Sequence, residues 1–461
     1  MNKVFTRRTF GAATVTLPVP LALAACGAGG PAAGTGEAGP ATVRSGVKLL
    51  LLGNQAQASA DAVQELVTAF PKAVAGLSAE YINVPTNYYD KLQSLLAGDT
   101  APDVCWTDVR QFPAYAAAGR LRQIDQLAAR DKFDVADFFE KGVVQYRWNS
   151  GAGGSAERLY GLPWDFGFRQ IFYNVNLFQE AGVPLPPGDW KAGGWTFNDF
   201  LDAARRLTKK DGGQITQFGY ANTIDYSAWV YANGGRNTNE ENTESWLDKP
   251  EATEAFGFLA DLMQRHQVAQ TTAHMKERNP INTFMEGKAA MSLHPTASGT
   301  AQFRRIKDFT WDVAPLPRGA QLKGDRRTHG GGSGWMIPAA GKNPEEAWAL
   351  LKYLSARDAH EQFARAGVAP SRMSVARSAV WMDPSVPPKS KGVFAEGGNY
   401  IMSNPKLLSW DEYDAAVAKE LDKLWAAEVN AATLSTNLKR VTAPLIQKHK
   451  DQLAELKKSA R

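Results

Sequence analysis

The spacing of apolar residues changes from a continuous run to a three- or four-residue period between residues 49 and 70. Leu49 to Leu52 form a continuous apolar run that ends at Gly53, which is typical of a strand buried on both faces of an α/β sheet. From Ser59 to Phe70 the apolar residues recur every three or four positions, which predicts an amphipathic helix with Ser59 as its N-cap. The pattern continues as a strand at 79–84, a helix at 88–96 that stops at Gly98, and a strand at 104–106. This βαβαβ order predicts a parallel sheet.

Strand-like and helix-like patterns remain mixed in the rest of the chain. The further predicted strands are 170–174, 289–293, 310–313 and 334–338, and the further predicted helices are 196–208, 251–266 and 343–354. No internal repeat of fixed period is visible. The mixture indicates an α/β protein.

The first 25 residues have the pattern of an export signal. Arg7 and Arg8 stand directly before a Thr-Phe pair, which is similar to a twin-arginine signal. The uncharged stretch 12–25 that follows contains two prolines and is shorter than the roughly 20 apolar residues of a spanning helix. We therefore predict a signal peptide at 1–25 that is removed on export.

The signal region ends in Leu-Ala-Ala followed by Cys26, which resembles the lipobox of bacterial lipoproteins. This motif predicts cleavage before Cys26 and attachment of diacylglycerol to its sulfur; the alternative is a plain secretory peptide that contains a cysteine. Residues 26–44 are rich in Gly, Ala and Pro and are predicted to be a flexible linker between the lipid anchor and the folded body. Cys105 is the only other cysteine, so no disulfide is expected.

Composition and charge exclude several classes of protein. Hydrophobic residues make up 44% and charged residues 21%, as in an average soluble protein, which disfavours collagen, coiled coils and polytopic membrane proteins. Removal of Lys3, Arg7 and Arg8 leaves 49 of the 52 basic residues against 47 acidic ones, a net charge of +2. The one dense basic stretch, 448–461, reads as a short terminal helix tail that also carries acids, so we expect no nucleic-acid partner.

Five motifs in order resemble the family 1 extracellular solute-binding proteins, the lipoprotein receptors of bacterial ABC importers for sugars. The motifs cover residues 89–104, 159–196, 284–291, 331–348 and 367–372. Their most specific parts are Gly-Leu-Pro at 161–163, Tyr-Asn-Val-Asn-Leu-Phe at 173–178, and Gly-Gly-Ser-Gly-Trp-Met-Ile-Pro at 331–338.

The resemblance implies a two-lobed α/β fold of the periplasmic-binding-protein type (class II), with a ligand cleft that closes by hinge bending. Crossings between the lobes are expected near 163–165, 314–317 and 372–376. Lobe 1 would then comprise 45–163 plus 318–374, and lobe 2 would comprise 164–317 plus 375–461. The resemblance also implies ABC permease subunits and their ATPase as partners, a membrane attachment through the lipid anchor, no cofactor and no metal. We expect a monomer.

A sugar ligand requires aromatic platforms for its CH faces and carboxylates or amides for its hydroxyls. Trp106 and Asp108 follow the third predicted strand, at the carboxyl end where open α/β sheets bind ligands. Tyr226 and Trp229 share a helix face that is either cleft or core. His294 departs from the family pattern and is a weaker candidate. The expected ligand-binding residues are Asn54, Trp106, Asp108, Asp165, Phe166, Tyr226, Trp229, Ser333, Trp335 and Trp410, each with core packing or local capping as its alternative.

A secreted carbohydrate hydrolase is the alternative function. It would need two carboxyl groups on opposite sides of a glycosidic bond, and nothing singles out such a pair among the 47 acidic residues. The chain lacks common hydrolase and nucleotide-binding motifs, and its six histidines show no metal-ligand spacing. The sequence therefore predicts capture of a mono- or oligosaccharide or a polyol without chemistry.

Overall fold

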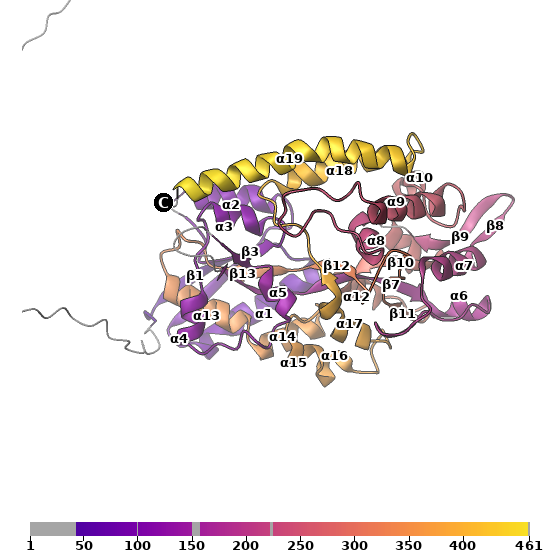
Figure 1. Cartoon of the computed structure of the whole chain (residues 1–461). Coiled ribbons are helices and arrows are strands. Elements are labelled where there is room, and N and C mark those ends of the chain that lie inside the picture. The colour runs from indigo at the N-terminus through magenta and orange to yellow at the C-terminus, as the bar shows by residue number, and fades with distance from the viewer. Residues whose placement is uncertain (1–42, 99, 150–156, 222–224, 460–461) are drawn as a thin grey trace, which may run out of the picture. The chain divides into compact units, whose positions relative to one another are not determined.

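Two β-sheets organise the protein in the computed structural model, which describes residues 43–98, 100–149, 157–221 and 225–459 (Figure 1). The strands of the first sheet are β1 (Val47–Gly53), β2 (Leu77–Asn83), β3 (Val104–Asp108), β6 (Gly161–Pro163) and β13 (Ser333–Met336). Their spatial order is β2-β1-β3-β13-β6. β1 pairs in parallel with β2 and β3, which confirms the predicted βαβαβ opening, whereas β13 pairs antiparallel with β3 and β6.

Helices before and after these strands pack on the first sheet. They are α1 (Gln57–Ala73), α2 (Tyr88–Ala97), α3 (Phe112–Ala117), α4 (Asp125–Arg130), α5 (Glu140–Val144), α13 (Pro344–Leu354) and α14 (Arg357–Arg365), with a small hairpin of β4 (Arg147–Trp148) and β5 (Arg158–Leu159). Helix α1 buries Val63, Leu66 and Phe70, the face that the apolar spacing predicts. It begins two residues before Ser59, because the carbonyl of Ala56 already accepts the amide of Ser59 (3.0 Å).

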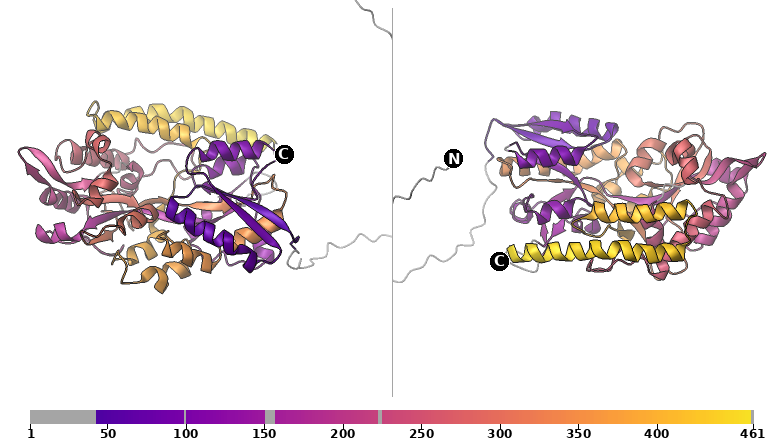
Figure 2. Two further views of the ribbon diagram at one scale, coloured as in Figure 1. Left: turned by 180° about the vertical axis from the view of Figure 1, so that it is seen from behind. Right: turned by 90° about the horizontal axis from the view of Figure 1, so that it is seen from above.

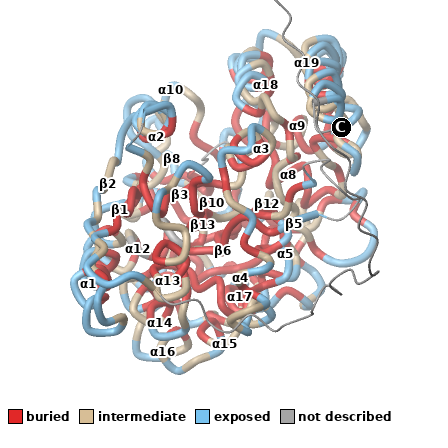
Figure 3. The backbone as a smooth tube through the Cα atoms, turned by 90° about the vertical axis from the view of Figure 1, so that its left-hand side faces the viewer, coloured by how far each residue is buried: buried red, intermediate tan, exposed pale blue. Residues whose placement is uncertain are grey.

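The second sheet has seven strands. They are β7 (Gly167–Asn174), β8 (Lys209–Asp211), β9 (Gln214–Ala221), β10 (Ala289–Pro295), β11 (Trp311–Ala314), β12 (Thr328–Gly331) and β14 (Ile401–Met402). Their order is β14-β12-β7-β10-β9-β8, and β11 pairs with the far half of β7. Figure 3 shows that β3, β6, β10 and β13 are mostly buried, while the outer faces of α1 and α19 are exposed.

The second sheet is covered by helices from two parts of the chain, 175–303 and 410–459. They are α6 (Val175–Glu180), α7 (Phe197–Leu207), α8 (Tyr226–Ala232), α9 (Pro250–Met263), α10 (Thr272–Glu277), α11 (Pro280–Met285), α12 (Thr296–Phe303), α18 (Trp410–Trp425) and α19 (Ala431–Ser459). Short helices α15 (Met373–Ala376), α16 (Ala379–Met382), α17 (Gly392–Gly397) and η1 (Gly398–Tyr400) lie between α14 and β14. The predicted helix at 196–208 is confirmed as α7, and Thr196 caps it in a capping box with Asp199.

Helix α19 is much longer than the short terminal helix that the sequence predicts. It spans 29 residues and contains Pro444. Leu434, Leu438 and Ile446 are buried, and α19 packs on α18 and α9, which stabilises a helix whose own pattern is weak. Its C-terminal end extends to α3 of the first sheet (Figure 2). In the described part of the chain, no helix has the length and hydropathy to cross a membrane.

The chain passes between the two sheets three times. The last passage leads from β13 to β14 within residues 337–400, where the sequence predicts a crossing near 372–376. The first two are adjacent: one joins β6 to β7 through residues 164–166, and the other joins β12 to β13 through Gly332 alone. Oδ1 of Asp165 accepts both the amide and the hydroxyl of Ser333 (2.6 Å each), which ties the two passages together. Gly332 has no room for a side chain, because a Cβ would lie 2.1 Å from the Asp165 carbonyl oxygen.

The second passage differs in position from the crossing expected at 314–317. Residues 328–331 still belong to the second sheet, since Gly330 pairs with Phe168 and Gly331 pairs with Gly167. The sheet assignment of 318–331 therefore differs from the lobe boundary that the sequence suggests. Strand β12 reads Thr-His-Gly-Gly, which carries no apolar alternation that could have revealed it.

Cys105 is free and buried in β3, and burial raises the pKa of its thiol to about 12. Such a thiol is protonated at neutral pH and is therefore inert. Cys26, the signal region and the predicted linker up to residue 42 lie outside the described residues.

Candidate ligand-binding cleft

A cavity of about 800 Å³ lies where the loop after β3 faces the second sheet and α18. Arg110 comes from the first-sheet side, just beyond the carboxyl end of β3. The opposite side is formed by β7, β10, β12, the N-terminus of α8, the α10–α11 connection and one face of α18. A position beyond the carboxyl end of a strand is where open α/β sheets bind ligands. We call this cavity the cleft.

Four polar side chains form a connected network on one wall of the cleft. Arg169 lies on β7 and His329 lies on the adjacent antiparallel strand β12, and both contact the carboxylate of Asp225, the N-cap of α8. Nδ1 of His329 is 2.9 Å from Oδ1 of Asp225, and its Nε2 is 3.0 Å from Oδ1 of Asn404. The network holds these groups in fixed orientations, because each is bonded to at least one partner.

The network also fixes the charge of Asp225. Burial alone would raise the pKa of its carboxyl, but the Arg169 guanidinium and His329 outweigh burial and hold the pKa well below its usual range. His294, on β10, lines the same cavity; burial, aided by Arg169, lowers its pKa to about 3. The cleft therefore contains a permanent carboxylate and a neutral imidazole at physiological pH.

One face of α18 also lines the cleft. Trp410, Asp414, Ala418, Asp422 and Trp425 all line the cleft, and their spacing of three or four residues puts them on the same side of a helix. The other face of α18 packs into the core. Along this wall the carboxylates of Asp414 and Asp422 lie between two tryptophans, Trp410 and Trp425, each of which is 5% exposed.

The carboxylate of Asp414 is a candidate hydrogen-bond acceptor for a ligand in the cleft. It is half-buried and forms no ion pair with another residue in the described part of the chain. Burial raises the pKa of its carboxyl; Arg110 opposes this shift, while Asp225 and Asp411 add to it. A partly desolvated acceptor of this kind gains from a hydroxyl or amino donor that a ligand supplies.

Two of the residues expected from the sequence lie in the cleft. Tyr226, the first residue of α8, and Trp410, the first residue of α18, both line it. Asp108 does not line the cleft. Its carboxylate accepts hydrogen bonds from the backbone amides of Arg110 and Gln111 and pairs with the Arg110 guanidinium (3.1 Å). Asp108 therefore positions Arg110, which does line the cleft.

Three other expected residues lie at the passage between the sheets. The Asp165 carboxylate is occupied by Ser333, and burial raises its pKa despite those hydrogen bonds. Phe166 is buried and stacks on Phe139 with a centroid separation of 5.4 Å. None of the three lines the cleft cavity.

The remaining expected residues are packed against other side chains or lie away from the cleft. Trp229 and Trp335 are both 0% exposed, Trp229 in the core of the second sheet and Trp335 in the core of the first. Their aromatic type suits a core as well as a cleft, and here packing determines their positions. Trp106 is 9% exposed and packs edge-on against Tyr88, and Asn54 follows β1 outside the cavity.

The residues that sequence reasoning missed come mainly from α18 and from the polar network. Asp225 and His329 carried no motif that would distinguish them from surface residues. The four-residue spacing from Trp410 through Asp414 and Ala418 to Asp422 was a usable signal, because it marks a polar face on an otherwise core-packed helix.

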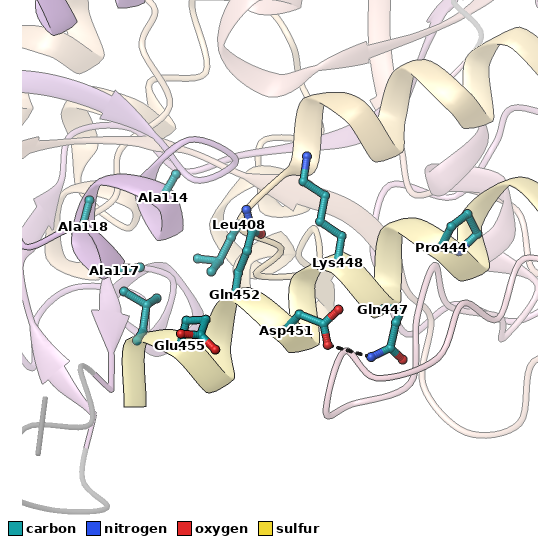
Figure 4. A pocket seen from close by; sticks show the side chains of 11 residues that line it. Ala114, Ala117, Ala118, Leu408, Pro444, Gln447, Lys448, Asp451, Gln452 and Glu455 are labelled. Carbon is teal, nitrogen blue, oxygen red and sulfur yellow. Dashed lines mark hydrogen bonds between the residues drawn. The ribbon is translucent and has the colours of Figure 1, made fainter. Parts of the chain in front are cut away.

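A second cavity, of about 710 Å³, separates α3 from the C-terminal half of α19 (Figure 4). We call it the α3–α19 groove. Ala114, Ala117 and Ala118 face it from one side, and Pro444, Leu408 and the stems of longer side chains complete it. Among its polar groups, Gln447 donates to Asp451 (2.8 Å) and Lys448 pairs with Glu412 (2.6 Å), whereas the buried Oε1 of Gln452 has no hydrogen-bond partner among the described residues.

The fold and the cleft define an α/β binding protein with a polar cavity beside the passage between two sheets. Residues 56–361 match the family model of bacterial extracellular solute-binding proteins, and the chain belongs to this family. The resemblance noted from the sequence motifs is thereby confirmed.

Solved structures confirm the predicted α/β periplasmic-binding-protein fold. An ABC substrate-binding protein from Listeria monocytogenes in complex with cycloalternan superposes with a TM-score of 0.75 at 22% identity, over 86% of this chain and 98% of the other. The GacH receptor of Streptomyces glaucescens, solved without ligand and with acarbose, has a TM-score of 0.72 at 21% identity, over 87% and 99% of the two chains.

The relatives found by sequence match a smaller share of this chain than the solved structures do. A binding protein of Brucella abortus is 27% identical over 213 residues, 45% of this chain and 49% of the relative. An arabinooligosaccharide-binding protein of Halalkalibacterium halodurans is 25% identical over 300 residues, 64% of this chain and 63% of the relative. The chain spans about half the length of the first of these relatives.

Proposed function

We propose that the protein is the substrate-binding component of an ABC importer and captures a carbohydrate in the cleft. The observation that carries this proposal is the chemistry of the cleft lining: two carboxylates lie between two tryptophans along α18, and a network of Arg169, Asp225 and His329 lines the same cavity. Rings suit the CH faces of a sugar, and fixed acceptors and donors suit its hydroxyls. The sugar ligands named for the related structures support this substrate class.

Ligand capture follows from the position of the cleft. Arg110 belongs to the first sheet, and the rest of the wall belongs to the second sheet and α18. A ligand that bonds to both sides is bound more tightly when they approach, so it shifts the protein toward a closed form that the permease subunits would recognise. The residues involved bind and orient the ligand and carry out no reaction.

We further propose that the two halves built on the two sheets are the lobes, with residues 164–166, Gly332 and a segment between β13 and β14 as the connections between them. The predicted signal peptide at 1–25, with its twin-arginine-like start, would direct export. A lipid on Cys26 and the linker to residue 44 would then attach the folded body to the outer face of the cytoplasmic membrane. We also propose that the protein is a monomer.

The test is thermal unfolding of residues 43–461 with mono- and oligosaccharides, polyols and sugar phosphates, each followed by chromatography. A ligand that binds only the folded state raises the melting temperature. A rise with one sugar class and no product supports the proposal. Product formation would instead favour a carbohydrate hydrolase, and no rise with any sugar would overturn the carbohydrate assignment. Mass spectrometry of the membrane-extracted protein tests the lipid on Cys26.

A further inference from the structure

Both arginines that line the cleft already have a carboxylate partner. Arg110 donates to Asp108 through Nη2 (3.1 Å), and Arg169 pairs with Asp225. The first pair lies beside the first sheet and the second pair beside the second sheet. Each guanidinium therefore has its charge balanced within its own half of the protein.

The two histidines of the cleft are bonded as well. One ring nitrogen of His329 contacts Asp225 (2.9 Å), and the other contacts Asn404 (3.0 Å). Nε2 of His294 lies 2.8 Å from the Ser292 hydroxyl, and the ring is neutral because burial lowers its pKa to about 3. These imidazoles have no ring nitrogen left for a further carboxylate.

Asp414 is the half-buried carboxylate that this pairing leaves over. It forms no ion pair with any residue that the structure describes. Burial raises the pKa of its carboxyl, and the nearby charges of Asp225 and Asp411 add to the rise, although Arg110 and His329 oppose it. A ligand cation beside Asp414 would relieve both the lost hydration and the repulsion, whereas a neutral hydroxyl would relieve only part of the first.

Tyr226 supplies a second unsatisfied group close to Asp414. Its side chain lines the cleft and is 8% exposed. Its hydroxyl has no hydrogen-bond partner among the described residues, while the neighbouring Ser227 hydroxyl accepts from Asn237 (3.0 Å). Burial raises the pKa of the Tyr226 phenol well above its usual range, and Tyr413 and the charge of Asp414 add to the rise. The phenol therefore stays neutral, and its oxygen is open to an N–H donor.

A protonated amine satisfies both groups at once. It carries a positive charge and three N–H donors, so it can donate to the Asp414 carboxylate and to Oη of Tyr226 together. A sugar hydroxyl has one donor and no charge, and it can donate to only one of the two oxygens.

We infer, on the basis of the proposed function, that the ligand is an amino sugar whose protonated amine binds between Asp414 and Tyr226. Asp414 then determines the specificity, because a charged donor balances its carboxylate and a hydroxyl does not. Neutral sugars of the same configuration bind more weakly.

Titration calorimetry of the protein at neutral pH measures this preference. The probes are glucose, galactose and mannose, their 2-amino-2-deoxy forms, the 3-, 4- and 6-amino-deoxy forms of glucose, and the N-acetyl derivative of each amine. Within each set the hydroxyl, the ammonium group and the neutral amide stand on the same carbon. We expect an amine to bind at least about tenfold more tightly than both of its neutral counterparts, since a charge-assisted hydrogen bond is about twice as strong as a neutral one.

Two variants test the two groups separately. Asp414→Asn keeps the shape of the side chain and removes its charge, so the preference for the amine should fall to about threefold or less. Tyr226→Phe removes only the unpartnered hydroxyl and should weaken binding of the amine about fivefold. Glu412→Gln is the matched control, because Glu412 is an exposed carboxylate of α18 that pairs with Lys448 and does not line the cleft. This control should leave the preference unchanged.

The outcomes separate this inference from the proposed function. Neutral sugars that bind as tightly as their amines would overturn the amine site while sugar binding stands. A preference that survives in Asp414→Asn, or amine binding that Tyr226→Phe does not weaken, would also overturn it. So would an equal loss of preference in Glu412→Gln, because net charge and not Asp414 would then select the ligand. If no probe binds, the carbohydrate assignment fails and this inference fails with it.

Discussion

The cleft and the α3–α19 groove are two cavities of similar size and opposite chemistry. Their volumes are about 800 and 710 Å³. The cleft presents a buried charge network and a half-buried carboxylate, Asp414, without an ion-pair partner in the described chain. In the groove, alanines face the stems of longer side chains, of which Lys448 pairs with Glu412 (2.6 Å). Volume alone therefore does not identify a binding site for a polyhydroxy ligand.

The two cavities also differ in their effect on the stability of the fold. A carboxyl whose pKa is raised in the folded protein destabilises the fold at neutral pH, and Asp414 is such a group. The charged groups that line the groove have partners: Lys448 pairs with Glu412, Asp451 accepts from Gln447, and Glu455 pairs with Lys458. We conclude that the cleft is organised for binding at some cost in stability, whereas the groove is a packing defect between a helix of each half.

The largest effect is expected when the charge network loses its central carboxylate. Asp225→Ala leaves Arg169 partly buried without its partner and removes the cap of α8. Breaking a buried ion pair from one side costs about 3–5 kcal/mol of unfolding free energy, and sugar binding should be lost. Urea denaturation measures the change, with the exposed Asp411→Ala as control. An unchanged urea midpoint in Asp225→Ala would contradict the proposed structural role of the network.

His294 should make the stability of the folded protein decrease in acid. Its pKa is about 3 in the folded protein against 6.5 in the unfolded chain, so the unfolded state takes up the proton first as the pH falls below 6.5. Between pH 7 and pH 5 this linkage removes about 2 kcal/mol of unfolding free energy. His294→Phe should show a correspondingly smaller loss in urea denaturation at the two pH values. Equal losses in variant and wild type would show that His294 is not held neutral.

Asp414→Asn should separate binding from stability. Loss of the charged acceptor weakens sugar binding about tenfold, the equivalent of about 1.4 kcal/mol. The folded-state pKa is raised, so the charged form opposes folding above that pKa, and the variant should be slightly more stable than wild type at pH 7 and no more stable at pH 3. Calorimetric titration and melting curves give the two quantities. A variant that binds normally would exclude Asp414 from the site.

The smallest effect is expected in the groove. Ala117→Ser adds one hydroxyl to a wall of the α3–α19 groove and touches nothing in the cleft. Sugar affinity should stay within twofold and unfolding free energy within about 0.5 kcal/mol. A tenfold change in affinity would mean that the groove takes part in binding, and the comparison between the two cavities would no longer hold.

Much of the fold could be predicted from the sequence, because the pattern that marks each of these elements lies within the element itself. The run at 49–52 and the three- and four-residue spacing of 59–70 each reflect one element packing on one core, and both elements form as expected. Strand β12 escaped detection because its pairing partner, β7, lies about 160 residues earlier and its own sequence has no apolar alternation.

The site was only partly predictable because an aromatic residue suits a core and a cleft equally well. Tyr226 lines the cleft while Trp229, one turn later on α8, is fully buried. Which face of α8 meets the cavity depends on the placement of α8 against β12, and no local pattern encodes that placement. The same holds for α18, where Asp414 faces the cavity and Tyr413, its neighbour, is buried.

The position of β13 determines the order in which the protein can fold during synthesis. This strand lies between β3 and β6 in the first sheet, yet it is made about 170 residues after β6. At roughly 5–20 residues per second, the ribosome needs on the order of 10 to 35 seconds to supply it. Until then β3 and β6 have an open space between them, so the half of the protein that begins first cannot complete its sheet until nearly three quarters of the chain has been made.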